Sequence, residues 1–115
     1  YDLRMKLPPD SVIAEAKVTQ YLLVPQARAD KSAFLARAGY TAGNAEALIH
    51  DLRKMLHAHE ATPAGTNQFG DYYELRGSLH GPNGTILSVN TIWMREHLSG
   101  ECRFITLLSD KRKLK

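Results

Sequence analysis

The sequence predicts an α+β fold in which N-terminal helices pack on one face of an antiparallel β-meander. Two observations predict this class. Apolar residues recur at intervals of three and four within residues 11–60, whereas residues 71–109 alternate between apolar and polar positions. The first period is that of an amphipathic helix and the second is that of a strand. Helices followed by consecutive short strands are expected to form a helical layer on a sheet.

The 115 residues are predicted to form one domain, because this length supports a single hydrophobic core. We expect a helical part at about 11–60, a sheet part at about 71–109 and a basic tail at 110–115. No apolar run approaches the roughly 20 residues needed to span a membrane. Since the chain begins with Tyr1 and not with methionine, we expect it to be a piece of a longer protein.

The basic tail accounts for the formal net charge of +3. Of 15 basic and 12 acidic side chains, residues 110–115 hold four and one, so residues 1–109 are balanced. The tail is interpreted either as a solvated chain end or as an arm that attracts phosphate groups. The net charge alone therefore does not identify a nucleic-acid-binding protein.

Two short helices are predicted before residue 40. The first spans Glu15–Leu23 and ends before Pro25, which cannot continue a helix. The second spans Asp30–Ala38, with its first residue as the N-cap and Gly39 in the left-handed conformation that commonly ends helices. Lys31 lies in the first turn, where the helix dipole disfavours a cation. That position raises the question of a functional role for Lys31.

The third helix is predicted to begin after Asn44, which is a favourable N-cap residue. Its apolar stripe consists of residues at spacings of three and four: Ala45, Leu48, Leu52, Met55 and Leu56. At about 100° per residue, His59 falls in line with this stripe. His50 and His57 fall on the opposite side, where we expect solvent. Helix phase thus selects His59 as the histidine that faces the sheet.

Three strands are predicted, at Tyr72–Leu79, Thr85–Arg95 and Cys102–Ser109. Asn83-Gly84 between the first two is a hairpin signal, because both residues tolerate positive φ. Residues 61–70 are rich in turn formers and are predicted to be a loop.

Strict alternation assigns each strand two faces. Thr91 and Trp93 of the middle strand share a face with Leu87 and Val89. In the last strand, alternation places Thr106 on the same face as Cys102, Phe104 and Leu108. The question for function is whether Thr91 and Trp93 belong to the core or form the floor of an active site.

Several kinds of site are excluded by the sequence. The glycines match no phosphate-binding loop, and no serine lies in a nucleophile elbow. His57 and His59 are two residues apart and would diverge on a helix, so they cannot share a metal ion there. Paired carboxylates at a useful spacing are also missing. We therefore expect a site without metal or cofactor.

The remaining candidates are His59, Lys31, Thr91, Thr106 and Trp93. They suit RNA cleavage by attack of the 2′-OH, which needs a proton acceptor, a proton donor and groups that stabilise the phosphorane. Histidine can fill either proton role, and a tryptophan can stack on a splayed base.

Each of these residues also has a purely structural interpretation. His59 fits a hydrogen-bonded core histidine, and Trp93 fits a core aromatic residue. Thr91 and Thr106 fit ordinary strand residues. The sequence leaves both interpretations open.

Three segments in the second half of the chain carry a family resemblance. The segment 77–84, Gly-Ser-Leu-His-Gly-Pro-Asn-Gly, is followed by Val-Asn-Thr-Ile-Trp at 89–93 and Arg-Phe-Ile-Thr at 103–106. The pattern extends upstream to Tyr-Leu-Leu-Val-Pro at 21–25 and to Lys-Ser-Ala-Phe-Leu-Ala-Arg-Ala-Gly-Tyr at 31–40. It resembles a small bacterial domain family found at the C-termini of polymorphic toxins, over roughly residues 6–109.

More remotely, the order of helices and strands is similar to the barnase, EndoU, colicin and RelE class of metal-independent ribonucleases. Thr91-Ile92-Trp93 resembles the serine and tryptophan two residues apart in the site of colicin D, which cleaves tRNA. The resemblance implies that His59 acts as base or acid, that Lys31 contacts phosphate, and that Thr91 and Thr106 donate hydrogen bonds. It leaves His57 as an alternative to His59.

The resemblance further implies substrate-binding roles for Arg76, Arg103 and His57. It implies a toxin ribonuclease, with tRNA as a substrate, a cognate immunity protein as a partner and delivery by a larger secreted effector into the cytoplasm of a target cell. The alternative from another class is a non-enzymatic protein- or nucleic-acid-binding module of a larger bacterial or phage protein.

Overall fold

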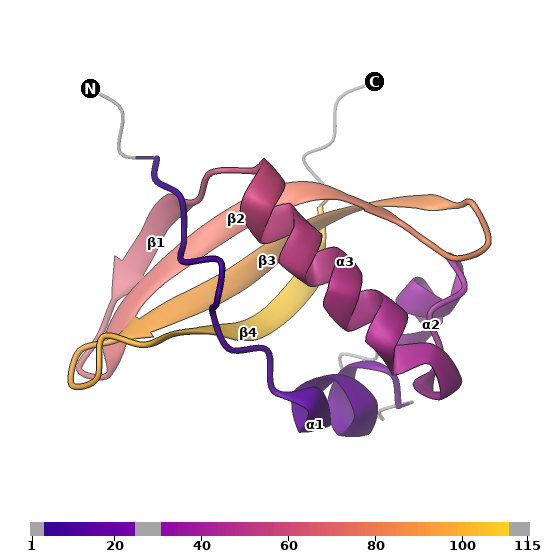
Figure 1. Ribbon diagram of the computed structural model, residues 1–115, viewed down its shortest axis with the longest axis horizontal. Coiled ribbons are helices and arrows are strands. Elements are labelled where there is room, and N and C mark those ends of the chain that lie inside the picture. Colours follow the sequence, from indigo (N-terminus) through magenta and orange to yellow (C-terminus); the bar gives the residue numbers. More distant parts are fainter. Residues whose placement is uncertain (1–3, 25–30, 111–115) are drawn as a thin grey trace.

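The computed structural model describes residues 4–24 and 31–110. Helices cover one face of an antiparallel sheet, which confirms the predicted α+β class. The longest helix, α3 (Ala45–Ala58), crosses the sheet obliquely, and the short helices α1 (Glu15–Lys17) and α2 (Ser32–Ala36) lie toward its N-terminal end (Figure 1). No helix among the described residues is both long and apolar enough to cross a membrane.

The sheet has four strands in the order β1-β2-β3-β4, each antiparallel to its neighbour. The three predicted strands are present as β2 (Gly70–His80), β3 (Ile86–Glu96) and β4 (Cys102–Ser109). The fourth, β1 (Thr62–Thr66), lies in the predicted loop and corrects that prediction. It is almost entirely exposed and contains a proline and a glycine, so it carries no alternating apolar pattern.

A β-bulge between β3 and β4 corrects the predicted faces of the last strand. Ile92 pairs with Thr106, but the next residue, Trp93, pairs with Phe104. Ile105 is therefore the extra residue that a bulge inserts, and alternation reverses beyond it. Thr106 consequently shares the outer face with Ile92, on the opposite side of the sheet from Trp93.

The helices differ from prediction mainly at their ends. The first predicted helix is one α-helical turn, α1, continued by a π-helix, η1 (Val18–Leu22). The predicted N-cap Asp30 lies outside the described residues, whereas Gly39 has the expected positive φ of 94°. Asn44 does not cap α3 with its side chain. It belongs to the preceding 3₁₀ turn η2 (Ala42–Asn44), where its Oδ1 accepts a hydrogen bond from the Thr41 N–H at 2.7 Å.

The core lies between α3 and the inner face of the sheet. The predicted stripe of α3 is buried, and it belongs to one hydrophobic cluster with inner-face residues of β2, β3 and β4. The largest fully buried side chain, Trp93, packs edge-to-face on Phe104 with ring centroids 5.3 Å apart. This layer fixes α3 over β2 and thereby positions the end of the helix beside the strand.

Candidate functional site

The candidate site lies where β1 separates from β2. The last β1–β2 pair is Thr62 with Glu74, but β2 continues to His80. From Leu75 onward, β2 has β3 on one side and no described strand on the other. The C-terminal part of α3 packs beside this open edge. The result is a groove between a helix and a strand edge.

Two cavities make up this groove, and His59 and Ala58 line both of them. The cationic cavity, of about 460 Å³, is lined by Arg4, Lys6, Ala58, His59, Glu60, Thr62, Glu74 and Arg76. The helix cavity, of about 340 Å³, is lined by Asp51, Lys54, Met55, Ala58, His59, Ser78 and His80. Every second residue of β2 from Glu74 to His80 lines one cavity or the other, so the two are consecutive along the strand.

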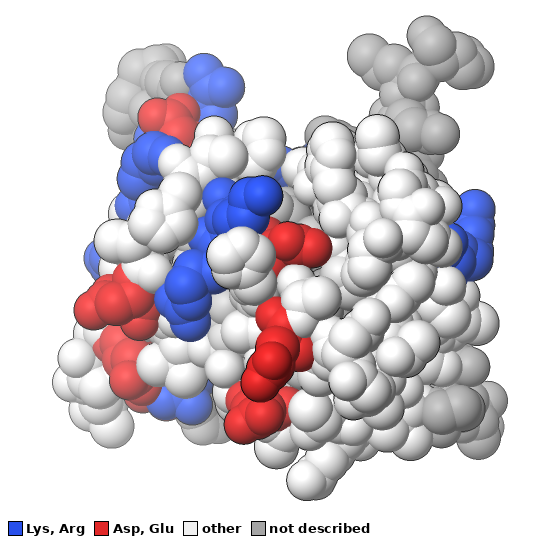
Figure 2. Space-filling view, turned by 45° about the vertical axis from the view of Figure 1, so that its right-hand side comes forward, with Lys and Arg blue, Asp and Glu red and all other residues white. Residues whose placement is uncertain are grey.

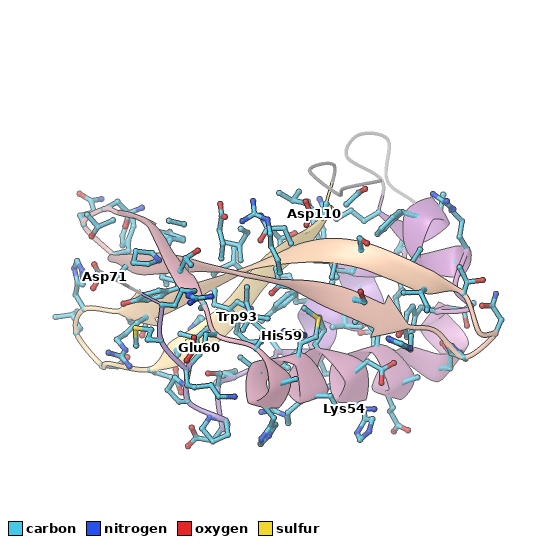
Figure 3. All side chains as sticks on the ribbon, turned by 90° about the horizontal axis from the view of Figure 1, so that it is seen from above. Lys54, His59, Glu60, Asp71, Trp93 and Asp110 are labelled. Atoms are coloured by element: carbon cyan, nitrogen blue, oxygen red, sulfur yellow. The ribbon has the colours of Figure 1, made fainter. Side chains whose placement is uncertain are left out.

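His59 occupies the centre of the groove because α3 ends one residue before it. Its backbone is extended (φ −130°, ψ 157°), and its N–H donates to the Met55 carbonyl at 3.0 Å. The side chain lies between the C-terminal end of α3 and the sheet (Figure 3). A Cβ atom added at Gly77 would lie 2.9 Å from His59 Nε2. The imidazole thus rests against bare backbone of β2.

Arg76 and Glu74 form the sheet wall of the cationic cavity. Arg76 Nη1 lies 2.8 Å from Glu74 Oε1, and Arg76 Nε lies 3.6 Å from Asp110 Oδ2. Both side chains of the closer pair are about one-third exposed, at 30% and 31%. The guanidinium is therefore held in place by two carboxylates while it remains accessible to a ligand.

The opposite wall carries Arg4 and Lys6 from the N-terminal segment. Backbone hydrogen bonds between Met5 and Ala61 hold this segment beside the end of α3. Lys6 Nζ donates to the His57 carbonyl oxygen, so its ammonium group lies at the negative end of the helix dipole. Arg4 Nε lies 4.0 Å from Glu60 Oε1.

The cationic cavity therefore combines one imidazole with two carboxylates and three cations. Histidine and glutamate can accept and donate protons. Arginine and lysine bind phosphate oxygens, arginine with a planar fork and lysine as a point charge. Among residues 4–24 and 31–110, no group of three His, Cys, Asp or Glu side chains is arranged to hold a metal ion.

Only two of the residues predicted from the sequence meet in the groove, His59 and Arg76. Thr91 and Trp93 lie beneath it and are both 0% exposed. Trp93 Nε1 donates to Thr91 Oγ1 at 2.8 Å, and Thr91 Oγ1 donates to the Leu75 carbonyl at 2.7 Å. In this structure neither residue presents a surface to a substrate, and both support the strand that forms the groove wall.

The other predicted residues lie elsewhere. Lys31 is the residue before α2, and α2 lies near the N-terminal end of α3 (Figure 1). His59 follows the other end of α3, a 14-residue helix that is about 21 Å long. Arg103 pairs with Glu101 and Glu96 near the N-terminal end of β4. The predicted alternative, His57, is exposed and lines neither cavity.

Thr106 lies on the outer face of the sheet because of the bulge. Its Oγ1 is buried and has no hydrogen-bond partner among the described residues. The structure thus separates Thr106 from Thr91, with which the sequence grouped it.

Sequence reasoning missed Glu74, Lys6, Asp51, Ser78 and His80. One signal was present, because alternation places Glu74, Arg76 and Ser78 on one face of β2. What the sequence did not show is that β1 leaves the edge of β2 open beside them. Nothing in the sequence marks Lys6 as a site residue, because its position depends on the contact between the N-terminal segment and the chain after α3.

Comparison with known proteins places the chain in a family. Residues 7–111 match a domain of unknown function, DUF6883, and the chain belongs to this family. The structure is similar to a chain of the contact-dependent growth inhibition toxin–immunity protein complex from Klebsiella pneumoniae 342, with a TM-score of 0.64. The identity is 19%, over 89% of this chain and 95% of that chain, so the similarity shows a shared fold. No curated protein matches the chain.

Proposed function

We propose that this domain is a bacterial toxin that cleaves RNA, with tRNA as a substrate class, without a metal ion. The observation that carries the proposal is the cationic cavity, which brings His59, Glu74, Arg76 and Lys6 to one place. The similarity to a chain of a growth inhibition toxin–immunity protein complex and the sequence resemblance to polymorphic-toxin domains support the biological role.

The proposed reaction is an internal transesterification. Glu74 accepts the proton of the ribose 2′-OH as its oxygen attacks phosphorus, and protonated His59 donates a proton to the leaving 5′-oxygen. The P–O5′ bond breaks, leaving a 2′,3′-cyclic phosphate on one product and a 5′-OH on the other. Arg76 and Lys6 contact the non-bridging oxygens, where charge develops in the transition state.

The buried residues of the sequence-based site have a supporting role in this proposal. The Thr91 hydroxyl ties Trp93 to the Leu75 carbonyl, next to Arg76 in the chain. Trp93 and Thr91 therefore shape the strand that carries the groove, while Lys31, Thr106, Arg103 and His57 are not assigned to the reaction.

The first test is incubation of the purified domain with total tRNA in the presence of EDTA. We expect cleavage, and a rate lowered about 10²- to 10⁴-fold in His59→Ala because general acid–base catalysis contributes this much. His57→Ala is the matched control, since His57 lies two residues away and outside the cavities. Intact RNA, or equal rates for wild type and His59→Ala, would refute the mechanism.

The second test concerns the toxin role. We propose that the domain acts in the cytoplasm of a target cell after delivery by a larger effector and that the producing cell makes an immunity protein. Induced expression is expected to arrest bacterial growth, and His59→Ala to relieve the arrest while His57→Ala does not. Undisturbed growth with soluble wild-type protein would favour a non-enzymatic binding module.

A further inference from the structure

The helix cavity has features that the proposed cleavage reaction does not use. Its apolar wall is formed by Met55 and Ala58, and its polar groups come from Asp51, Ser78 and His80, together with Lys54. Its volume of about 340 Å³ lies within the range of small-molecule binding sites. Because His59 is shared with the cationic cavity, a ligand in the helix cavity would adjoin the reacting phosphate.

Asp51 is held in a fixed position at this cavity. Tyr40, which is 1% exposed, donates a hydrogen bond from Oη to Asp51 Oδ2 at 2.6 Å. Burial, and then the hydrogen bond and charge of Asp51, raise the pKa of Tyr40 well above its ordinary value, so the phenol remains a donor. Asp51 Oδ1 accepts no hydrogen bond from any described residue. One carboxylate oxygen is therefore anchored and the other is open to a ligand.

We propose that the helix cavity is a nucleobase subsite in which Asp51 selects bases that carry an exocyclic amino group. Adenine, cytosine and guanine can donate such an N–H to a carboxylate oxygen, as cytosine N4 does to acidic side chains in nucleic-acid complexes. Uracil presents carbonyl oxygens at the corresponding positions, which a carboxylate repels. Met55 and Ala58 would pack against the base. This subsite rests on the proposed RNA-cleaving function, because it adjoins His59.

The test uses DNA oligonucleotides that contain a single ribonucleotide, so that only one phosphodiester can be cleaved. The bases on the two sides of that phosphate are varied between cytosine and uracil. Wild type is expected to cleave the cytosine substrate faster, by roughly tenfold or more for a well-placed base contact. Asp51→Asn should lose this preference, because an amide both donates and accepts hydrogen bonds.

Two variants control for effects on folding. Asn at position 51 still offers an oxygen to Tyr40, and thermal melting will check that the domain remains folded. Glu46→Gln removes a carboxylate from the first turn of the same helix, outside the cavities, and should keep the wild-type preference. Equal rates on both bases for wild type, or a preserved preference in Asp51→Asn, would overturn the subsite while leaving the cleavage mechanism intact.

A binding experiment separates the subsite from catalysis. All-DNA oligonucleotides with deoxycytidine or deoxyuridine at the test position cannot be cleaved, and their affinities can be measured by fluorescence anisotropy. Tighter binding of deoxycytidine by wild type but not by Asp51→Asn supports the subsite even if no RNA is cleaved. Equal affinity for both bases in wild type, together with no cleavage, would overturn both proposals.

Discussion

Gly77 is the residue on which the position of His59 depends most directly. A Cβ atom at this position would lie 2.9 Å from His59 Nε2 and 3.0 Å from Met55 Cε. Both atoms belong to side chains that can move, so we expect Gly77→Ala to fold with a loss of about 1–3 kcal/mol in unfolding free energy, as for other overpacked sites. Displacement of the imidazole by about 1 Å should lower RNA cleavage up to about 100-fold.

The measurements are single-turnover cleavage rates and urea denaturation of the same samples. Gly43→Ala is the matched control, because the added Cβ would have only Thr41 Oγ1 nearby, at 3.7 Å. If Gly77→Ala folds and cleaves RNA at the wild-type rate, Gly77 does not position a catalytic histidine.

Thr91 and Thr106 form a pair of threonines with opposite expectations for stability. Thr91→Val leaves the buried Trp93 Nε1 without its acceptor, and a buried polar group without a partner costs about 1–3 kcal/mol. Thr106→Val replaces a buried hydroxyl that has no described partner, so we expect little change or a small gain in stability. Denaturant melts will measure both, with Thr91→Ser retaining the hydroxyl as control. Equal losses in the two valine variants would contradict this assignment.

At the residue level, the sequence could select between neighbouring histidines but could not describe their surroundings. Helix phase favoured His59 over His57, and His59 is the one that lines the groove. It does so as an exposed residue after the end of the helix, not on the predicted buried stripe. For Trp93 the sequence could not decide between core and active site, because a tryptophan shows the same alternation along the strand in either place.

At the level of elements, the sequence predicted what depends on local pattern. The buried stripe of α3 and the three apolar strands follow from periodicity and burial. The strand β1 and the bulge at Ile105 do not follow from such a pattern. β1 pairs with β2 through its backbone while its own side chains are exposed, and the bulge depends on the register between β3 and β4. These two features decide where the edge of β2 is open and which face Thr106 occupies.

The end of the sheet opposite the β2–β3 hairpin carries an acid-sensitive contact between elements. Asp71 of β2 accepts hydrogen bonds from Thr66 of β1 at 2.8 Å and from His97 at 3.2 Å. The hydrogen bond from Thr66, and then that from His97, lower the pKa of Asp71 from its ordinary value. A lowered pKa in the folded state stabilises the protein above the unfolded-state pKa, and this contribution is lost as pH falls through the folded-state pKa.

We therefore expect the thermal stability of wild type to fall more steeply below about pH 4 than that of Asp71→Asn. Melting temperatures measured between pH 6 and pH 3 will check this, with Asp10→Asn as a control at an exposed position of the N-terminal segment. Parallel curves for wild type and Asp71→Asn would show that the contact does not contribute to acid sensitivity.

At the scale of the whole molecule, charges of both signs occur on the same face of the folded part (Figure 2). Acidic and basic side chains lie next to one another on the face shown in Figure 2, and residues 1–109 are balanced in formal charge. A site that handles phosphate in such a protein depends on a few local cations, such as Arg76 and Lys6. Long-range attraction of RNA is then expected to depend on the basic residues after Asp110.

Removing residues 111–115 tests this expectation, because it changes the formal net charge from +3 to −1. Each phosphate contact with a single strand contributes about 0.7 to the slope of log affinity against log salt concentration. Loss of four cations should therefore lower the magnitude of this slope by up to about three and weaken RNA binding at low salt. The cleavage rate at saturating RNA should remain unchanged, because His59 and Glu74 are retained.

Fluorescence anisotropy at several KCl concentrations measures the slope, and single-turnover kinetics measure the rate. Lys17→Gln removes one cation from the helical part, away from the groove, and should change the slope by less than one. A truncated domain with the wild-type slope would show that RNA is attracted by the folded part alone. A lowered rate at saturation would instead mean that the tail takes part in the reaction, and the active site would have to be extended beyond the groove along β2.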